Sequence, residues 1–71
     1  MAQHTFRLEG DYIELHTLLK LLALASSGGA AKALVAAGEV VVDGETETRK
    51  TRKLRTGQVV RLGDEEIHIV G

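Results

Sequence analysis

Residues 38–48, GEVVVDGETET, decide how this chain folds. Three consecutive valines favour an extended backbone, because β-branched side chains pack well on a pleated surface. Asp43-Gly44 is a dipeptide that tolerates positive φ at both central positions of a type I′ turn, and β-favouring threonines follow it. The stretch therefore predicts a β-hairpin, and Gly38 suits the left-handed position that ends a preceding helix.

A first helix is expected upstream, after a short strand at HTFRL, residues 4–8. Its apolar face consists of leucines at the i, i+3, i+4, i+7 spacing, namely Leu15, Leu18, Leu19 and Leu22. We expect Leu21 and Leu24 to widen this stripe. Asp11 and Glu14 match a capping box, which predicts that the helix starts there.

A second helix is expected after ASSGG, residues 25–29, because serine competes for backbone hydrogen bonds and glycine weakens a helix. Ser26 or Ser27 can cap it. A tight helix pair is predicted, because the apolar and mostly small side chains along this helix allow close approach to the first one. These residues are Ala30, Ala31, Ala33, Leu34 and Ala37.

Downstream, QVVRL (58–62) and EIHIV (66–70) flank a turn at Gly63-Asp64 and predict a second hairpin. We expect Val59, Ile67 and Ile69 to pack beneath the helices. The order is then β-α-α-β-β-β-β, which predicts an α+β fold with the helix pair packed on a small, largely antiparallel sheet.

Composition limits what such a chain can do. It has 71 residues, 44% hydrophobic and 27% charged, without cysteine. We expect a single domain over 1–71, monomeric and cytoplasmic, without a secretion signal or membrane span. A core this small leaves little room for a deep substrate cavity, which favours binding over catalysis and predicts no small-molecule substrate.

No residues are predicted to be catalytic. The histidines at His4, His16 and His68 lie on different expected elements, without a metal-ligand spacing and without cysteine to complete a zinc set. Glu65 and Glu66 adjoin a turn rather than face each other across a cleft. We therefore expect no cofactor, no metal and no enzymatic activity.

Positive charge is concentrated in residues 49–55, RKTRKLR, where the five cations are Arg49, Lys50, Arg52, Lys53 and Arg55. Six of the nine basic residues lie between positions 49 and 61, and no acid lies in that interval. Leu54 is the one apolar anchor, so the segment is expected to cross the surface as a connection. Such charges can simply protect a sheet edge, but five that repel one another favour an anionic partner.

A weaker signal is SSGGAAK, residues 26–32. Ser27, Gly28 and Gly29 open the second helix, where free amides and the helix dipole attract anions. The spacing is not that of a nucleotide-binding P-loop. In isolation a glycine-softened turn is the better interpretation.

Taken together, residues 25–60 resemble the αL RNA-binding motif, also called the S-four-type RNA-binding domain, and especially its short stand-alone bacterial members of the YbcJ type. The matching positions are Ser27, Ala31-Lys32, Gly38 to Gly44, and Gly57 to Val60. The resemblance implies RNA binding through the helix pair and the adjoining loop, within a motif core of about 12–62, with Lys32 and the basic loop on phosphates. Gly28 stands where many members have arginine. The backbone amides of Gly28 and Gly29 would then bind phosphate in place of that guanidinium.

Several expectations follow for the partner. Phe6 and Tyr12 are the only aromatic residues, so base stacking has few candidates and structured RNA is the expected ligand. Among structured RNAs, the family resemblance favours ribosomal RNA. About five neutralised phosphates predict a log-log salt slope of roughly −4 to −5. Arg52→Glu is expected to weaken RNA binding with little effect on melting temperature. The alternative is a protein interaction module whose basic loop docks on an acidic partner surface.

Overall fold

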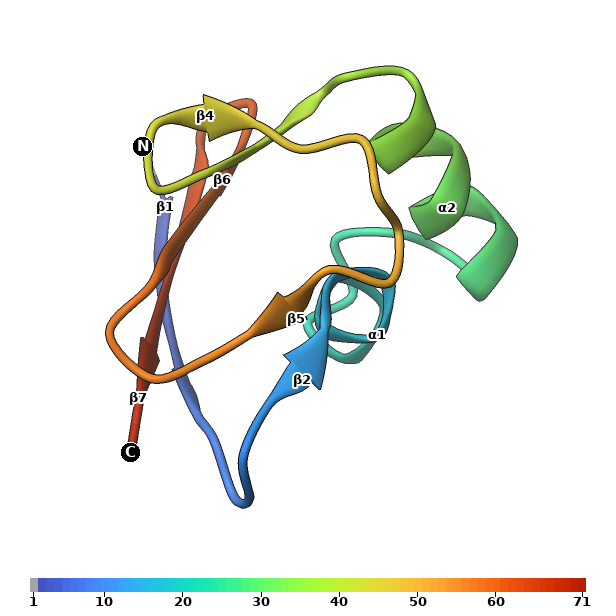
Figure 1. The fold of residues 1–71 in the computed structure, drawn as a ribbon. Helices are drawn as coiled ribbons and strands as arrows, with labels where there is room; N and C mark the ends of the chain where they lie inside the picture. Colours follow the sequence, from blue (N-terminus) through green and yellow to red (C-terminus); the bar gives the residue numbers. More distant parts are fainter. Residues whose placement is uncertain (1) are drawn as a thin grey trace.

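The computed structural model describes residues 2–71. The elements are β1 (Ala2–Arg7), β2 (Ile13–Glu14), α1 (Leu15–Leu21), α2 (Gly28–Ala36), β3 (Val40–Val42), β4 (Glu45–Thr46), β5 (Lys53–Leu54), β6 (Val59–Leu62) and β7 (Glu65–Val70). A five-stranded sheet has the order β1-β7-β6-β3-β4, and β2 pairs with β5 in a second, two-stranded sheet. Both helices lie to one side of the larger sheet (Figure 1), so the α+β prediction is confirmed. No helix within 2–71 has the length and apolar character needed to cross a membrane.

The larger sheet is antiparallel except for one pair. β1 runs parallel to β7, whereas β7, β6, β3 and β4 pair antiparallel in that order. Asp43 and Gly44 have φ values of 50° and 86°, as a type I′ turn between β3 and β4 requires. Both predicted hairpins are therefore present, the second closing through the Leu62↔Glu65 pair.

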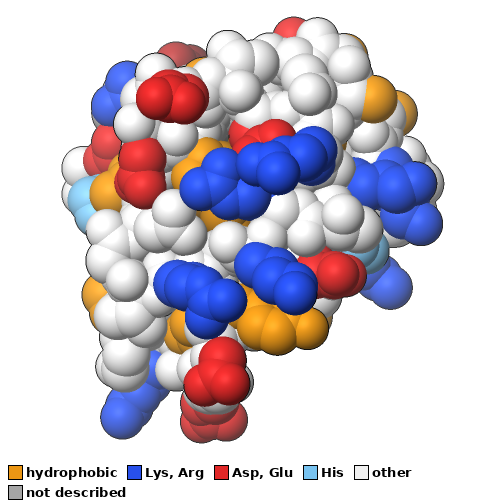
Figure 2. Space-filling view, in the orientation of Figure 1, with side chains coloured by type: hydrophobic (Ala, Val, Ile, Leu, Met, Phe, Trp, Pro, Cys, Tyr) orange, Lys and Arg blue, Asp and Glu red, His pale blue; other side chains and the backbone are white. Residues whose placement is uncertain are grey.

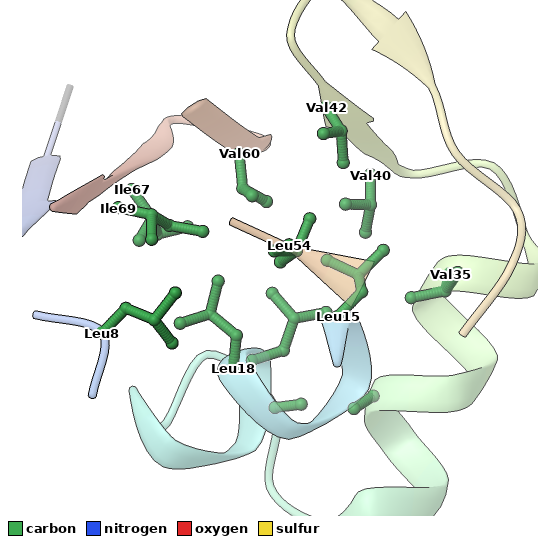
Figure 3. Packing of buried hydrophobic residues seen from close by; sticks show 13 residues of the cluster. Leu8, Leu15, Leu18, Val35, Val40, Val42, Leu54, Val60, Ile67 and Ile69 are labelled. Carbon is green, nitrogen blue, oxygen red and sulfur yellow. The ribbon is translucent and has the colours of Figure 1, made fainter. Parts of the chain in front are cut away.

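The core lies between α1 and the inner face of this sheet (Figure 3). Val60 and Ile67 are paired across β6 and β7, and both are fully buried in the same core cluster as Leu18. The prediction for Val59 was wrong by one residue: Val60 faces the core, and alternation along the strand turns the side chain of Val59 to the other face.

Helix α1 is shorter than predicted, because it begins after the expected capping box and ends before the last leucines of the expected stripe. It begins at Leu15, and Glu14 at the N-cap position makes no side-chain capping bond, so the predicted capping box is wrong. It ends at Leu21, whose side chain is 62% exposed rather than part of the apolar stripe. Ala23 then takes a positive φ of 58°, which redirects the chain toward α2.

Helix α2 begins where the serines predict. Ser27 is its N-cap, and the Ser27 Oγ accepts a hydrogen bond of 3.1 Å from the backbone amide of Ala30. Ala31 and Val35 are fully buried on the face toward α1, whereas Ala33 is exposed. Gly38 follows the helix with a φ of 76°, the left-handed conformation predicted for it.

Candidate functional site

The cationic stretch between β4 and β6 is held in place through its backbone. We refer to Arg49, Lys50, Arg52, Lys53 and Arg55 as the basic segment. The carbonyl oxygens of Arg52 and Lys50 accept hydrogen bonds of 2.9 and 3.0 Å from the amides of Leu15 and His16, which open α1. These amides have no acceptor within their own helix. The two bonds therefore satisfy the free donors at the start of α1 and also fix the basic segment.

Leu54 supplies the apolar anchor that the sequence predicts. Its side chain is fully buried, and its backbone pairs with Ile13 in the β2–β5 sheet. The segment is therefore partly a strand rather than only a surface connection. β5 pairs with β2, and β2 directly precedes α1. The backbone that carries Lys53 and Arg55 is therefore fixed.

A buried carboxylate lies beneath two of the cations. Glu47 is only 6% exposed. Arg49 donates from Nε and Nη2 to its two oxygens at 3.1 Å each, and Arg52 donates from Nη1 to Oε1 at 2.7 Å. The hydrogen bonds from the Arg49 side chain, joined by the backbone amide of Arg49 and the side chain of Arg52, lower the pKa of Glu47 to about 2. Glu47 is thus a carboxylate at neutral pH and compensates part of the local positive charge.

The expectation for Arg52→Glu needs correction as a result. Arg52 is half-buried and bound to Glu47, not a freely exposed cation. A glutamate at this position would place two carboxylates side by side in a partly desolvated setting, which destabilises the fold.

The other end of the basic segment contacts an aromatic ring. Lys53 Nζ lies 5.0 Å and Arg55 Cζ 5.9 Å from the ring centroid of Tyr12. Arg55 also donates from Nη1 to the backbone oxygen of Asp11 at 3.2 Å. Two long, flexible side chains are thereby directed to one place on the surface.

Figure 2 shows the resulting surface. Lys and Arg side chains gather over the β4–β5 connection and over β5, with further cationic side chains toward α2 at the right-hand side. Lys50 is exposed, and so is Lys32, the single cation of α2; neither forms an ion pair within residues 2–71. A shallow hollow of about 340 Å³ lies within the basic segment and is lined by Arg49, Thr51, Arg52 and Lys53.

Arg61 does not belong to this surface, although the sequence groups it with the basic segment. Arg61 Nη2 donates to Glu66 Oε1 at 2.9 Å, and His68 Nε2 lies 3.0 Å from the other oxygen of Glu66. The Arg61 bond and then the His68 bond lower the pKa of Glu66. Because Val60 faces the core, Arg61 lies on the opposite, outer face of the sheet.

The start of α2 is open. Gly28 and Gly29 occupy its first turn, and a Cβ added at Gly28 would meet nothing within 4 Å. The hydroxyl of Ser27 already caps the helix by accepting from Ala30, which is the structural role that the sequence predicts. The two glycines therefore leave the backbone at the start of α2 accessible, although no neighbouring atom would exclude a side chain at position 28.

Two residues of this surface were missed from the sequence. Glu47 precedes the cations by two and five positions, but nothing local shows that its carboxylate turns inward beneath them. Tyr12 is 44% exposed and reaches the basic segment through the pairing of Ile13 with Leu54, which joins parts of the chain far apart in sequence. The one available sequence signal concerned Glu47, which is an acid next to a run of cations.

A helix pair on a small sheet, with a basic connection clamped to the first helix, defines the chain as an αL-motif α+β domain. The chain belongs to the S4 domain family, whose profile matches residues 6–70. The predicted family is thus confirmed.

Individual relatives agree with this assignment. The chain is 42% identical over 59 residues to the Escherichia coli (strain K12) protein named "Putative RNA-binding protein YbcJ", covering 83% of this chain and 84% of that protein. It is 38% identical over 55 residues to the Bacillus subtilis (strain 168) protein named "Probable ribosome maturation protein RlbA", covering 78% of each. The solution structure of Escherichia coli YbcJ, described as revealing an αL motif involved in RNA binding, matches with a TM-score of 0.73 and 41% identity over 94% of this chain and 86% of that one.

Proposed function

We propose that this protein binds structured RNA through the basic segment together with Lys32, and that it does so without catalysing a reaction. The names of two relatives, one an RNA-binding protein and the other a ribosome maturation protein, support RNA as the ligand class. They also favour ribosomal RNA among structured RNAs.

The observation that carries the proposal is the clamped backbone of the basic segment. Its carbonyls at Lys50 and Arg52 are bonded to α1 and its Leu54 is buried, so five cations are held close together despite their repulsion. A polyanion offsets that repulsion and gains charge-assisted hydrogen bonds. The shallow, open form of the hollow suits a phosphate backbone better than an enclosed small molecule.

Within the segment the cations take different roles. Lys50, Lys53 and Arg55 have no carboxylate partner within residues 2–71, and with Lys32 they supply the charge that phosphates neutralise. Arg49 and Arg52 are partly compensated by Glu47 but keep further N–H donors for phosphate oxygens.

The start of α2 is the remaining part of the proposed interface. The amides of Gly28 and Gly29, oriented by the cap at Ser27, would contact a phosphate beside Lys32. They would replace the guanidinium that many family members carry at position 28. This contact fixes register on the RNA and carries no sequence information.

The test is the salt dependence of binding to a ribosomal RNA stem-loop between about 50 and about 200 mM salt. Four uncompensated cations give a log-log slope of about −3 to −4 on a duplex, less steep than five free charges would give. A flat response would reject the proposal. Binding that is equally strong to an acidic protein and is competed by RNA would instead favour the protein interaction module.

A further inference from the structure

Tyr12 is the exposed one of the two aromatic side chains in this molecule. The chain has one tyrosine, one phenylalanine and no tryptophan. Phe6 is packed against the core, whereas Tyr12 is 44% exposed at the surface. No hydrogen bond within residues 2–71 involves the Tyr12 hydroxyl, so a hydrogen-bonding role does not account for its position.

The ring lies inside the proposed RNA surface rather than beside it. Lys53 and Arg55 both approach it, at 5.0 and 5.9 Å from the centroid. The backbone at this point is fixed, because Ile13 pairs with Leu54 and Arg55 donates to the Asp11 carbonyl. Both cations lie over the exposed ring, and a nucleobase that takes their place at the ring face leaves them free to bind phosphates. A stacking ring with cations for the adjoining phosphates is how proteins hold an unstacked nucleotide.

Resting on the RNA-binding function proposed above, we propose that Tyr12 forms a nucleobase-stacking subsite. One unpaired nucleotide of a structured RNA stacks on the ring, and Lys53 and Arg55 bind the phosphates on either side of it. The ligand is thus narrowed to an RNA helix with a bulged or flanking unpaired base. Sequence-independent stacking fits a site in which the other contacts go to phosphates.

A purely structural role for the ring is the competing explanation. Exposed cation–π contacts contribute little stability, about 0.5–1 kcal/mol, and can serve only to position Lys53 and Arg55. That role predicts equal importance of Tyr12 for paired and bulged RNA. Stacking predicts importance for bulged RNA alone.

The first experiment uses the unaltered protein. Because Tyr12 is the single tyrosine and tryptophan is absent, intrinsic tyrosine fluorescence reports on this ring alone. We expect strong quenching on binding a stem-loop with one bulged adenosine, and much weaker quenching by a fully paired stem-loop of the same nucleotide count. Equal signals with both RNAs, when both are bound, overturn the inference.

The second experiment compares Tyr12→Phe with Tyr12→Leu at fixed salt. Phenylalanine keeps the π face, so affinity for the bulged RNA is expected to stay within about twofold, whereas leucine lowers it about five- to hundredfold, the loss expected for one stacked base. Affinity for the paired RNA should hardly change in either variant. Equal losses for both RNAs, or none for the bulged RNA, contradict stacking. Failure of the unaltered protein to bind either RNA is a distinct result, which rejects RNA binding itself.

Discussion

At the scale of single residues, the buried Glu47 reduces the number of cations in the basic segment that are free of an acidic partner. The sequence identifies the five cations, and the structure shows that two of them share one buried carboxylate. Side-chain direction in an irregular segment depends on which backbone bonds hold it, here those from Leu15 and His16, and these are not visible in residues 47–52. The cations were therefore predictable and their compensation was not.

Glu47→Gln should lower the free energy of unfolding by about 1–3 kcal/mol at pH 7, because charge-assisted hydrogen bonds to two arginines become neutral ones. The folded-state pKa of Glu47, about 2, lies below the ordinary value of 4.5. A lowered pKa stabilises the fold above the ordinary value, and this contribution is lost as pH falls toward the folded-state value. Urea unfolding of both proteins should show their difference shrinking between about pH 5 and about pH 2; a constant difference would contradict the ion-pair role.

The same substitution makes a prediction for RNA. Loss of the Glu47 charge leaves Arg49 and Arg52 uncompensated, so the log-log salt slope should become steeper by about one. Binding measured across the same salt range as for the unaltered protein tests this. An unchanged slope would mean that neither arginine lies within reach of phosphate.

At the scale of elements, local signals were reliable and distant pairings were not. Asp43-Gly44 predicted its hairpin because turn chemistry is local. The side chain of Asp43 also accepts from the Val59 amide at 2.9 Å and from Gln58 Nε2 at 3.0 Å, and these bonds lower its pKa. The β2–β5 sheet, two residues on each side, has no periodicity to detect and depends on Leu54 meeting Ile13 across the fold.

Leu54→Ala tests whether this small sheet is needed to hold the basic segment. Truncating a fully buried leucine costs about 2–5 kcal/mol. Domains of this size have only about 3–5 kcal/mol from one core, so the variant should be largely unfolded or melt far below the unaltered protein. Thermal unfolding followed by circular dichroism measures the effect.

Leu21→Ala is the matched control, because the same atoms are removed from a side chain that is 62% exposed. Its stability should change by no more than about 0.5 kcal/mol. Similar losses in the two variants would contradict the different burial of these leucines and, with it, the anchoring of β5.

At the scale of the whole molecule, charge is separated by side. The outer face of the sheet carries Arg61, Glu66 and His68 in a bonded group, whereas the basic segment keeps cations without acidic partners. The near-zero formal net charge of −1 therefore gives no indication of the local field. Sequence order grouped Arg61 with the basic segment because it could not show that β6 turns that side chain to the other side.

This separation gives a prediction that net charge alone cannot reproduce. Lys50→Glu and Arg7→Glu change the charge equally at exposed residues. Lys50 lies in the basic segment, whereas Arg7 ends β1, at the opposite edge of the sheet from β4. We expect Lys50→Glu to lower affinity for the RNA stem-loop about ten- to hundredfold, the loss of one charge-assisted contact.

Arg7→Glu should have little effect at physiological salt. Charges are screened within about 8 Å under those conditions, and the molecule measures 28 × 24 × 21 Å along its principal axes. Both substitutions are at exposed positions without ion pairs within residues 2–71, so melting temperatures should remain close to that of the unaltered protein. If the two variants lose affinity equally, binding responds to total charge, and the basic segment has no special place in it.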